Sequence, residues 1–257
     1  MQTPPAVSSD GLLTQIQSDS LHLYVYESRQ GALQAAAQAV AAEMRRLIAT
    51  QGRASGIFTA LPSQREFLSA LASAEGINWT RVIGFHLAEY WGVEEEAPQS
   101  LRRVLLEQLV KRVPIVEFHG LRGEASNARA VCANYAKLLQ SRPPDFATLE
   151  LSPNGRLGTL SSILDAVHDQ PAIKLIELDA AFRQQQLQTG AAATLSEIPQ
   201  RALSLTLSTV MNCPRLFVTT DAQIRPGALR DLLSGAASLL CTHPDAHLFL
   251  DRPLIGV

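Results

Sequence analysis

The sequence predicts one α/β domain, a three-layer fold with a mostly parallel central sheet and helices on both faces. Short β-rich apolar runs alternate along the chain with longer runs of helical spacing. Hydrophobic residues make up 46% of the 257 residues and charged residues 18%, which supplies enough apolar side chains for one large core. No linker-like stretch divides the chain, so we expect a single domain over residues 21–257.

The N-terminal segment, residues 1–20, has a different composition. It is rich in Ser, Pro and Gln, so we expect it to be partly disordered. It lacks the basic and apolar regions of a signal peptide, and no apolar run in the chain reaches the length of a membrane span. The three cysteines are too scattered for a disulfide framework. These features predict a cytoplasmic protein with no membrane partner.

Nine segments have the character of strands, being short and rich in β-branched, aromatic or other apolar residues. The first of them alternates apolar and polar side chains. Several others are short apolar runs between turn residues, as in buried strands. In chain order, the predicted strands are Leu21–Tyr26, Gly56–Thr59, Arg81–Leu87, Val116–His119, Phe146–Leu151, Ile173–Leu178, Ala202–Thr209, Leu216–Thr220 and His247–Leu250.

Helices are predicted between these strands, where apolar residues recur every three or four positions. Leu101, Leu105 and Leu109, for example, fall on one face of a helix. The predicted helices are Gly31–Thr50, Gln64–Ala74, Ser100–Val113, Ser126–Gln140 and Pro226–Leu240, with a helix end and loop over residues 184–193. The alternation of strands and helices implies βαβ units and therefore a mainly parallel sheet.

Ligands of open α/β sheets bind in the crevice at the carboxyl ends of the strands. The segments that follow the predicted strands are therefore the places to look for functional residues. They are Thr59–Ser63, His86–Tyr90, Ser152–Leu160, Leu178–Arg183 and Thr219–Arg225.

Five short strings in and beside these segments resemble motifs of a known family. Arg81–Tyr90 resembles the strand and loop V-x-x-F-x-M-D-E-Y, and Pro98–Ser100 resembles the H-P-x-S that follows it. Asp145–Leu160 resembles D-L-x-L-x-G-x-G-x-D-G-H-x-A. Ala202–Leu207 resembles A-x-T-x-G, and His243–Asp251 resembles the closing H-P-x-A-x-x-x-x-D. Because the strings keep the family's order, the chain resembles the glucosamine-6-phosphate deaminase/6-phosphogluconolactonase family from about Leu21 to Asp251.

The resemblance implies a role in carbohydrate metabolism, with isomerisation, deamination or lactone hydrolysis of a sugar 6-phosphate and no redox cofactor. In the deaminases a carboxylate moves a proton between C1 and C2 of the sugar, and a histidine assists ring opening. A buried carboxylate and an imidazole both titrate in the range that these steps need. The resemblance places the catalytic positions of this chain at Glu89, Asn154 and Arg156.

The acid and base groups themselves are substituted in this sequence. Ala88 stands at the position of the proton-transferring aspartate, and Asn154-Gly155-Arg156 replaces D-G-H. Ser161 stands where the family has a glutamate. Glu89 is the acid that remains, but adjacent side chains of a strand point to opposite faces, so we expect Glu89 to point away from the direction of residue 88.

The phosphate-binding positions are also altered. Ala60–Ser63 aligns with the family's T-G-S-T loop, so a leucine replaces the glycine and Pro62 removes an N–H donor. Thr59, Ser63, Arg183 and Arg225 are the predicted substrate-binding residues, because hydroxyl and guanidinium groups suit an anion. They predict a small anionic metabolite, in particular a sugar phosphate, as the ligand.

Other functional classes are excluded by composition and motif. A net charge of −2 and an isoelectric point near 6.3 give no basic footprint for nucleic acid. The histidines lack the spacing of metal ligands, and no cofactor-binding glycine loop occurs. Two hypotheses stay open: a sugar-phosphate enzyme with weak or lost family activity, and a catalytically silent homologue that binds an anionic metabolite or a protein partner as a regulator. Homo-oligomerisation is also left open.

Overall fold

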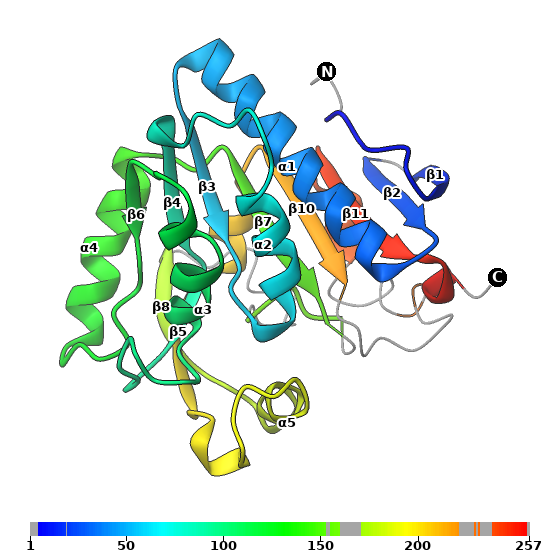
Figure 1. Cartoon of the computed structure of the whole chain (residues 1–257). Helices are drawn as coiled ribbons and strands as arrows, with labels where there is room; N and C mark the ends of the chain where they lie inside the picture. Colours follow the sequence, from blue (N-terminus) through cyan, green and yellow to red (C-terminus); the bar gives the residue numbers. More distant parts are fainter. Residues whose placement is uncertain are drawn as a thin grey trace.

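A central sheet of eight strands organises the computed structural model of this chain. The structure describes residues 5–18, 20–152, 155–159, 171–220, 229, 231 and 238–255. Across the sheet the strands are β1 (Leu12–Ser18), β2 (Leu21–Tyr26), β11 (Ala246–Asp251), β10 (Arg215–Thr220), β7 (Phe146–Leu151), β3 (Ala54–Phe58), β4 (Val82–His86) and β6 (Glu117–His119). All neighbours pair in parallel except β1 with β2, so the predicted α/β fold is confirmed (Figure 1).

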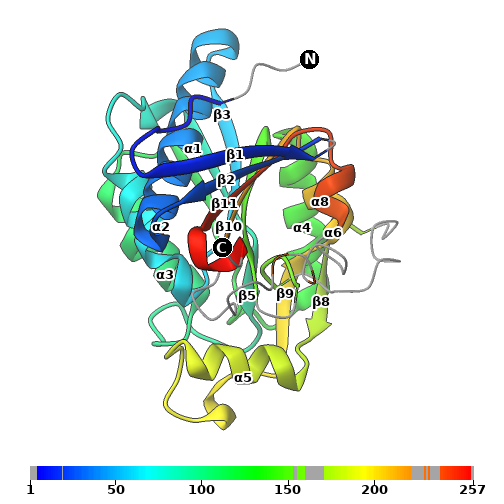
Figure 2. The ribbon, with the colours of Figure 1, turned by 90° about the vertical axis from the view of Figure 1, so that its right-hand side faces the viewer.

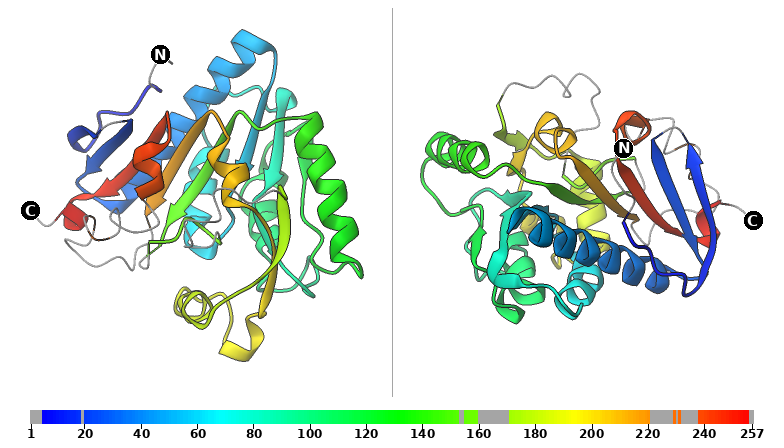
Figure 3. Two further views of the ribbon diagram at one scale, coloured as in Figure 1. Left: turned by 180° about the vertical axis from the view of Figure 1, so that it is seen from behind. Right: turned by 90° about the horizontal axis from the view of Figure 1, so that it is seen from above.

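Helices cover both faces of this sheet. The blue and cyan helices on one side in Figure 3 are α1 (Arg29–Gln51), α2 (Arg65–Ala72) and, beside them, α3 (Leu101–Gln108). On the other side lie α4 (Ala128–Ser141), α6 (Leu207–Met211) and α8 (Leu239–Thr242). Two hydrophobic clusters fill the spaces between the three layers, one on each face of the sheet.

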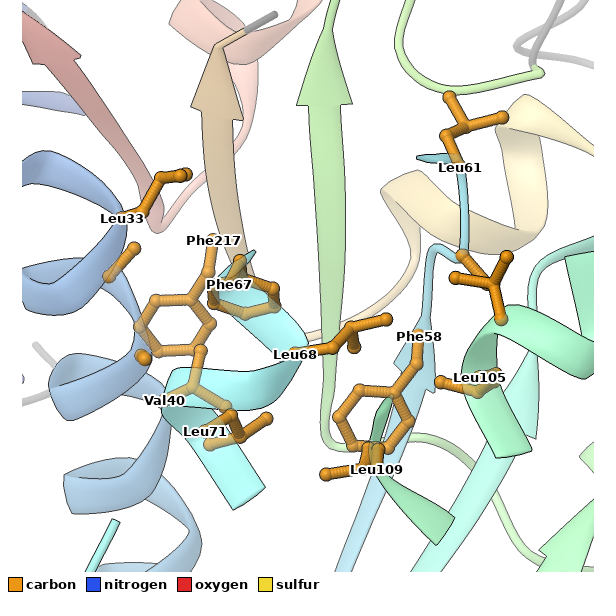
Figure 4. Packing of buried hydrophobic residues seen from close by; sticks show 14 of the residues in the cluster. Leu33, Val40, Phe58, Leu61, Phe67, Leu68, Leu71, Leu105, Leu109 and Phe217 are labelled. Carbon is orange, nitrogen blue, oxygen red and sulfur yellow. The ribbon is translucent and has the colours of Figure 1, made fainter. Parts of the chain in front are cut away.

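The first of these clusters depends on the composition of α1. The Ser28 hydroxyl accepts a hydrogen bond from the Gly31 N–H and caps the start of this helix, and Gly52 ends it at φ +79°. The alanines of α1 let the helix lie close to the sheet, while Leu33 and Val40 pack near Phe217 and the helix α2 (Figure 4). Burial of this face, rather than helix propensity alone, holds α1 in place.

Gly56 and Gly84 pair in register on β3 and β4 and make a direct test of this packing. A Cβ at Gly56 would lie 2.3 Å from the Phe146 ring, whereas a Cβ at Gly84 meets the tip of Ile115 at 3.1 Å. We expect Gly56→Ala to lower the free energy of unfolding by about 1–3 kcal/mol, the usual range for overpacking. Gly84→Ala is the control. In urea denaturation its free energy of unfolding should fall by less, because the tip of an isoleucine side chain moves more easily than a buried ring. Equal losses would contradict the expectation.

A second, antiparallel sheet of three strands lies beyond the carboxyl ends of the main sheet. Its order is β5 (Ala88–Tyr90), β9 (Arg201–Leu205) and β8 (Ile173–Glu177). The helix α5 (Ala180–Gln188) lies beside it, at the bottom of Figure 2. The sequence analysis predicted strands at the positions of β8 and β9, but it predicted neither β5 nor a second sheet.

Most predicted segments agree with the structure, and the differences have local causes. Leu21–Tyr26 and Phe146–Leu151 are confirmed residue for residue as β2 and β7. The predicted strand Ala202–Thr209 is wrong after Leu205, because the Thr206 hydroxyl caps α6 by accepting from the Thr209 N–H at 3.3 Å. Strand β1 was not predicted within residues 1–20, because most of its side chains are polar or exposed. The predicted helix Pro226–Leu240 falls largely outside the described residues.

Candidate functional site

The carboxyl ends of four neighbouring strands, β10, β7, β3 and β4, meet at one edge of the main sheet. The loop after β7 closes tightly at this edge: the Ser152 N–H donates to the Arg156 carbonyl, and the Gly158 N–H donates to the Glu150 carbonyl at 2.7 Å. Gly158 has φ +62°, and a Cβ there would lie 3.0 Å from Leu87. The glycine therefore lets this loop pack against the end of β4.

Thr59 is a predicted substrate-binding residue at the end of β3. Its side chain is buried, and its hydroxyl donates to the Thr148 carbonyl at 2.7 Å. The Thr148 hydroxyl lies 3.4 Å from the Thr59 N–H in return. These contacts give Thr59 a structural role in joining β3 to β7.

Ser63 lies in the short turn of 3-10 helix Pro62–Gln64 that precedes α2. Its hydroxyl donates to Oε2 of Glu150, and the Gln64 amide donates to the same oxygen at 2.6 Å. Gln64 also contacts the Thr219 hydroxyl at 3.0 Å. A carboxylate of the chain itself is therefore bound by the loop that the sequence analysis assigned to an external anion.

Glu150 was not singled out from the sequence. It is completely buried on β7, and it stands where the motif D-L-x-L-x-G has its glycine. A single acidic residue within the apolar strand Phe146–Leu151 was the available signal, since a carboxylate is seldom buried without a partner.

Glu89, the predicted catalytic acid, binds the start of α3. Its carboxylate accepts from the N–H groups of Tyr90, Leu101 and Arg102 at 2.7–3.0 Å. The Ser100 hydroxyl donates to it at 2.9 Å. Burial raises the pKa of Glu89 to about 7, against the effect of these donors. The carboxylate thus satisfies backbone N–H groups that a helix start would otherwise leave without partners.

Ala88 packs in the cluster on the opposite face from this carboxylate, and it pairs with Ser204 of β9. The expectation that Glu89 points away from residue 88 is therefore confirmed. The methyl group of Ala88 offers no proton acceptor, and the neighbouring Ser204 hydroxyl contacts Thr159 at 3.0 Å.

His86 ends β4 and is completely buried. Among the described residues its two ring nitrogens have no hydrogen-bond partner. Burial, with a smaller effect of the Arg102 cation, lowers the pKa of His86 to about 3. The ring is therefore neutral near pH 7, so it supplies no imidazolium as a general acid.

Arg156 and Arg183, the two described arginines of the predicted site, are both engaged within the chain. Arg156 forms an ion pair with Asp179, which also caps α5 by accepting from the Phe182 N–H at 2.8 Å. Arg183 donates to the carbonyls of Leu195 at 2.8 Å and Ile198 at 2.9 Å. In the described part of the chain, no hydrogen bond or ion pair links Arg183 to Ser63.

Three other predicted or substituted positions, Asn154, Ser161 and Arg225, lie outside the described residues. Their placement stays a prediction from the sequence. Within the described ranges, no group of His, Cys, Asp and Glu side chains has the arrangement of a metal site. The same ranges contain no helix that is long and apolar enough to cross a membrane.

Comparisons with curated proteins find glucosamine-6-phosphate deaminases. The chain is 26% identical to the enzyme of Halothermothrix orenii over 185 residues, which cover 68% of this chain and 75% of that protein. It is 24% identical to the enzyme of Listeria monocytogenes over 209 residues, which cover 79% and 87% of the two chains. No model of a protein family matches the chain.

Solved structures extend the similarity to the fold. A monomeric glucosamine-6-phosphate deaminase superposes with a TM-score of 0.76 at 19% identity and covers 90% of this chain and 98% of its own. A 6-phosphogluconolactonase from Shewanella baltica superposes with a TM-score of 0.70 at 16% identity, over 93% and 100% of the two chains. Together these comparisons confirm the resemblance that the strand-end motifs indicated.

Proposed function

We propose that this relative of the glucosamine-6-phosphate deaminase/6-phosphogluconolactonase family acts in carbohydrate metabolism as a binding protein whose family activity is weak or lost. The observation that supports loss of activity most directly is the environment of Glu89. Its carboxylate accepts one hydrogen bond from the Tyr90 N–H and three from the start of α3, and Glu89 is 1% exposed. Glu89 is the acid that remains at the proton-transfer motif, and its hydrogen bonds stabilise the start of α3.

The chemistry of the family explains why this matters. Moving a proton between two carbons of a sugar needs a group that takes the proton and returns it. Ala88 has only a methyl group, and the low pKa of the buried His86 makes its ring a weak base. Arginine stays protonated, so Arg156 cannot replace the histidine of the D-G-H motif as a base.

The fold still supports binding at the carboxyl ends of β3, β7 and β10, where open α/β sheets place their ligands. A sugar-derived metabolite is the ligand class that the relatives favour, since their names specify a sugar phosphate. The proposed role is therefore recognition of such a metabolite without its turnover.

The test of this proposal is turnover by the purified protein. Ammonia release from glucosamine 6-phosphate and hydrolysis of 6-phosphogluconolactone should each stay below about 1 s⁻¹, the low end of ordinary enzymes. A family deaminase and a family lactonase assayed beside it serve as positive controls. Ala88→Asp should not restore turnover, because one added carboxylate leaves Arg156 at the ring-opening position. Turnover above this limit by the unmodified protein would refute the proposal.

A further inference from the structure

The main sheet ends in strand β1, whose outer edge is open. β1 is the outermost of the eight strands and pairs only with β2 (Figure 1, Figure 2). In an antiparallel ladder, alternate residues turn their N–H and C=O groups away from the partner strand. Within the described part of the chain, no hydrogen bond outside the β1–β2 ladder engages the backbone of residues 13–16. This edge can therefore pair with a further strand.

Edge strands of natural sheets usually carry features that prevent such pairing, for example charged side chains, proline or short length. At the opposite edge of the main sheet, β6 has three residues, and Glu117 there forms an ion pair with Arg142 at 3.1 Å. The edge strands of the second sheet, β5 and β8, include Glu89 and Lys174 respectively. β1, by contrast, has seven residues and contains neither a charged side chain nor a proline.

Exposed apolar side chains also gather on β1. Leu13 is 43% exposed and Ile16 is 44% exposed, and Val116 is the other large hydrophobic residue that is exposed in the described part of the chain. A register shift between Leu12 and Thr14 affects the start of the strand, whereas its pairing with β2 is regular from Thr14 onward. Ile16 therefore lies on the regular part of an open edge, where a partner strand would cover apolar area.

The side chains of β1 suit antiparallel pairing of this strand with itself. A two-fold axis at the middle residue, Gln15, would place Gln15 opposite its symmetry mate and Thr14 opposite Ile16. An amide both donates and accepts hydrogen bonds, so two Gln15 side chains are complementary. Because the strand is uncharged, no like charges meet across the axis. An acidic or basic partner would find no opposite charge on this strand.

We propose that β1 pairs with β1 of a second copy of this chain, forming a homodimer in which the two main sheets are continuous. Such a contact uses the same surface on both copies, so it closes at two chains. The strands β2 and β11 separate β1 from β10, so the contact leaves the candidate site free. The inference is therefore independent of the proposed function.

Sedimentation equilibrium tests the proposal. As the concentration of the unmodified protein rises, its mass should approach twice the 27.8 kDa of one chain. Ile16→Lys places like charges near the two-fold axis, so it should raise the dissociation constant of the dimer by at least about tenfold. Val116→Lys is the matched control, since it changes another exposed β-branched residue, next to β6 at the far edge of the sheet. This variant should dimerise like the unmodified protein.

A mixture of two variants tests whether the two β1 strands meet each other. In a pairing centred on Gln15, the two side chains at position 16 are diagonal neighbours on one face of the sheet. Ile16→Lys and Ile16→Glu should each be largely monomeric alone, because like charges repel. An equimolar mixture should recover a dimer with one copy of each, since the charges at position 16 are then opposite. A contact elsewhere on the surface would give no such recovery.

Circular dichroism and thermal unfolding establish that the variants are folded. If the variants at position 16 do not fold, Gln15→Lys and Gln15→Glu replace them, because Gln15 is exposed and lies at the proposed axis. A monomeric unmodified protein overturns the proposal. A folded Ile16→Lys protein that dimerises normally, an equal loss in Val116→Lys, or a mixture that stays monomeric also overturns it. The turnover assays test the proposed function separately, whichever of these results is found.

Discussion

Replacing Arg215 with methionine is expected to lower the free energy of unfolding by about 3–5 kcal/mol, because it leaves two buried carboxylates without their shared cation. Arg215 is 1% exposed at the first position of β10. Its guanidinium donates to Glu43 at 2.6 Å and to Asp245 at 2.7 Å. Both acids are buried, so neither can exchange the lost contact for water at low cost.

Two controls isolate the effect of burial. Arg46 also contacts Glu43, at 2.7 Å, but its side chain is 43% exposed. Arg46→Met should therefore lower the free energy of unfolding by no more than about 1 kcal/mol, as measured by urea denaturation. In the double variant Arg215→Met/Glu43→Met the losses of unfolding free energy should be less than additive, because the second substitution removes one of the two carboxylates that Arg215 contacts.

The position of the Arg215 ion pairs also predicts that ligand binding will not depend on them. Arg215 begins its strand, so it lies at the amino end of the parallel sheet, whereas the candidate site lies at the carboxyl end. Ligand binding by the folded Arg215→Met protein should match that of the unmodified protein. A stability change within about 1 kcal/mol of zero would contradict the assigned role of the buried ion pairs.

The central layer of the fold could be predicted from local sequence because its strands are buried and apolar. Leu21–Tyr26 alternates and Phe146–Leu151 is a short apolar run, and both carry enough β-forming residues to define their boundaries. The local sequence of a strand does not determine which other strand it pairs with. The segments Ile173–Glu177 and Arg201–Leu205 have ordinary strand patterns, yet they form a separate antiparallel sheet.

The candidate site was predictable in position but not in its contacts. Parallel strands bring their carboxyl ends together, so the loops at Thr59 and Ser152 could be assigned to one edge. The direction of the Glu89 side chain followed from strand geometry, but its four donors come largely from a segment 11 to 13 residues later. The hydrogen bonds from Ser63 and Gln64 to Glu150 join residues more than 80 positions apart, so no local sequence pattern predicts them.

Glu89→Ala is expected to destabilise the protein by about 3–5 kcal/mol, because its carboxylate is the shared acceptor of four donors. The N–H groups of Tyr90, Leu101 and Arg102 would be left buried without this acceptor, at the junction of β5 and α3. For a domain of this size the loss corresponds to a fall in melting temperature of roughly 6–20 °C. Calorimetric unfolding at pH 7 measures it.

Ser100→Ala is the matched control at the same junction. It removes one of the donors to Glu89 and the hydroxyl that accepts from the Arg103 N–H at 3.1 Å. The usual loss for an N-cap substitution is about 1 kcal/mol. A much larger effect of Glu89→Ala than of Ser100→Ala would show that the carboxylate itself organises the start of the helix.

The stability contributed by Glu89 should also depend on pH in a defined direction. Burial raises its pKa from 4.5 to about 7, so the folded protein retains a proton that the unfolded chain releases in this interval. Its contribution is therefore fully present below pH 4.5 and is lost as the pH rises through 7. The free energy of unfolding of the unmodified protein, relative to that of Glu89→Gln, should fall between about pH 5 and pH 8.

These measurements separate a structural carboxylate from a catalytic one. A catalytic Glu89 would lose turnover on substitution while the melting temperature stayed near that of the unmodified protein, since acid and base groups contribute mainly to the transition state. If Glu89 is structural, its substitution by alanine causes a large loss of stability. Part of the stability that Glu89 contributes then depends on pH, and Glu89→Gln removes this dependence. Because all four donors to this carboxylate lie at the β5–α3 junction, we expect the second result.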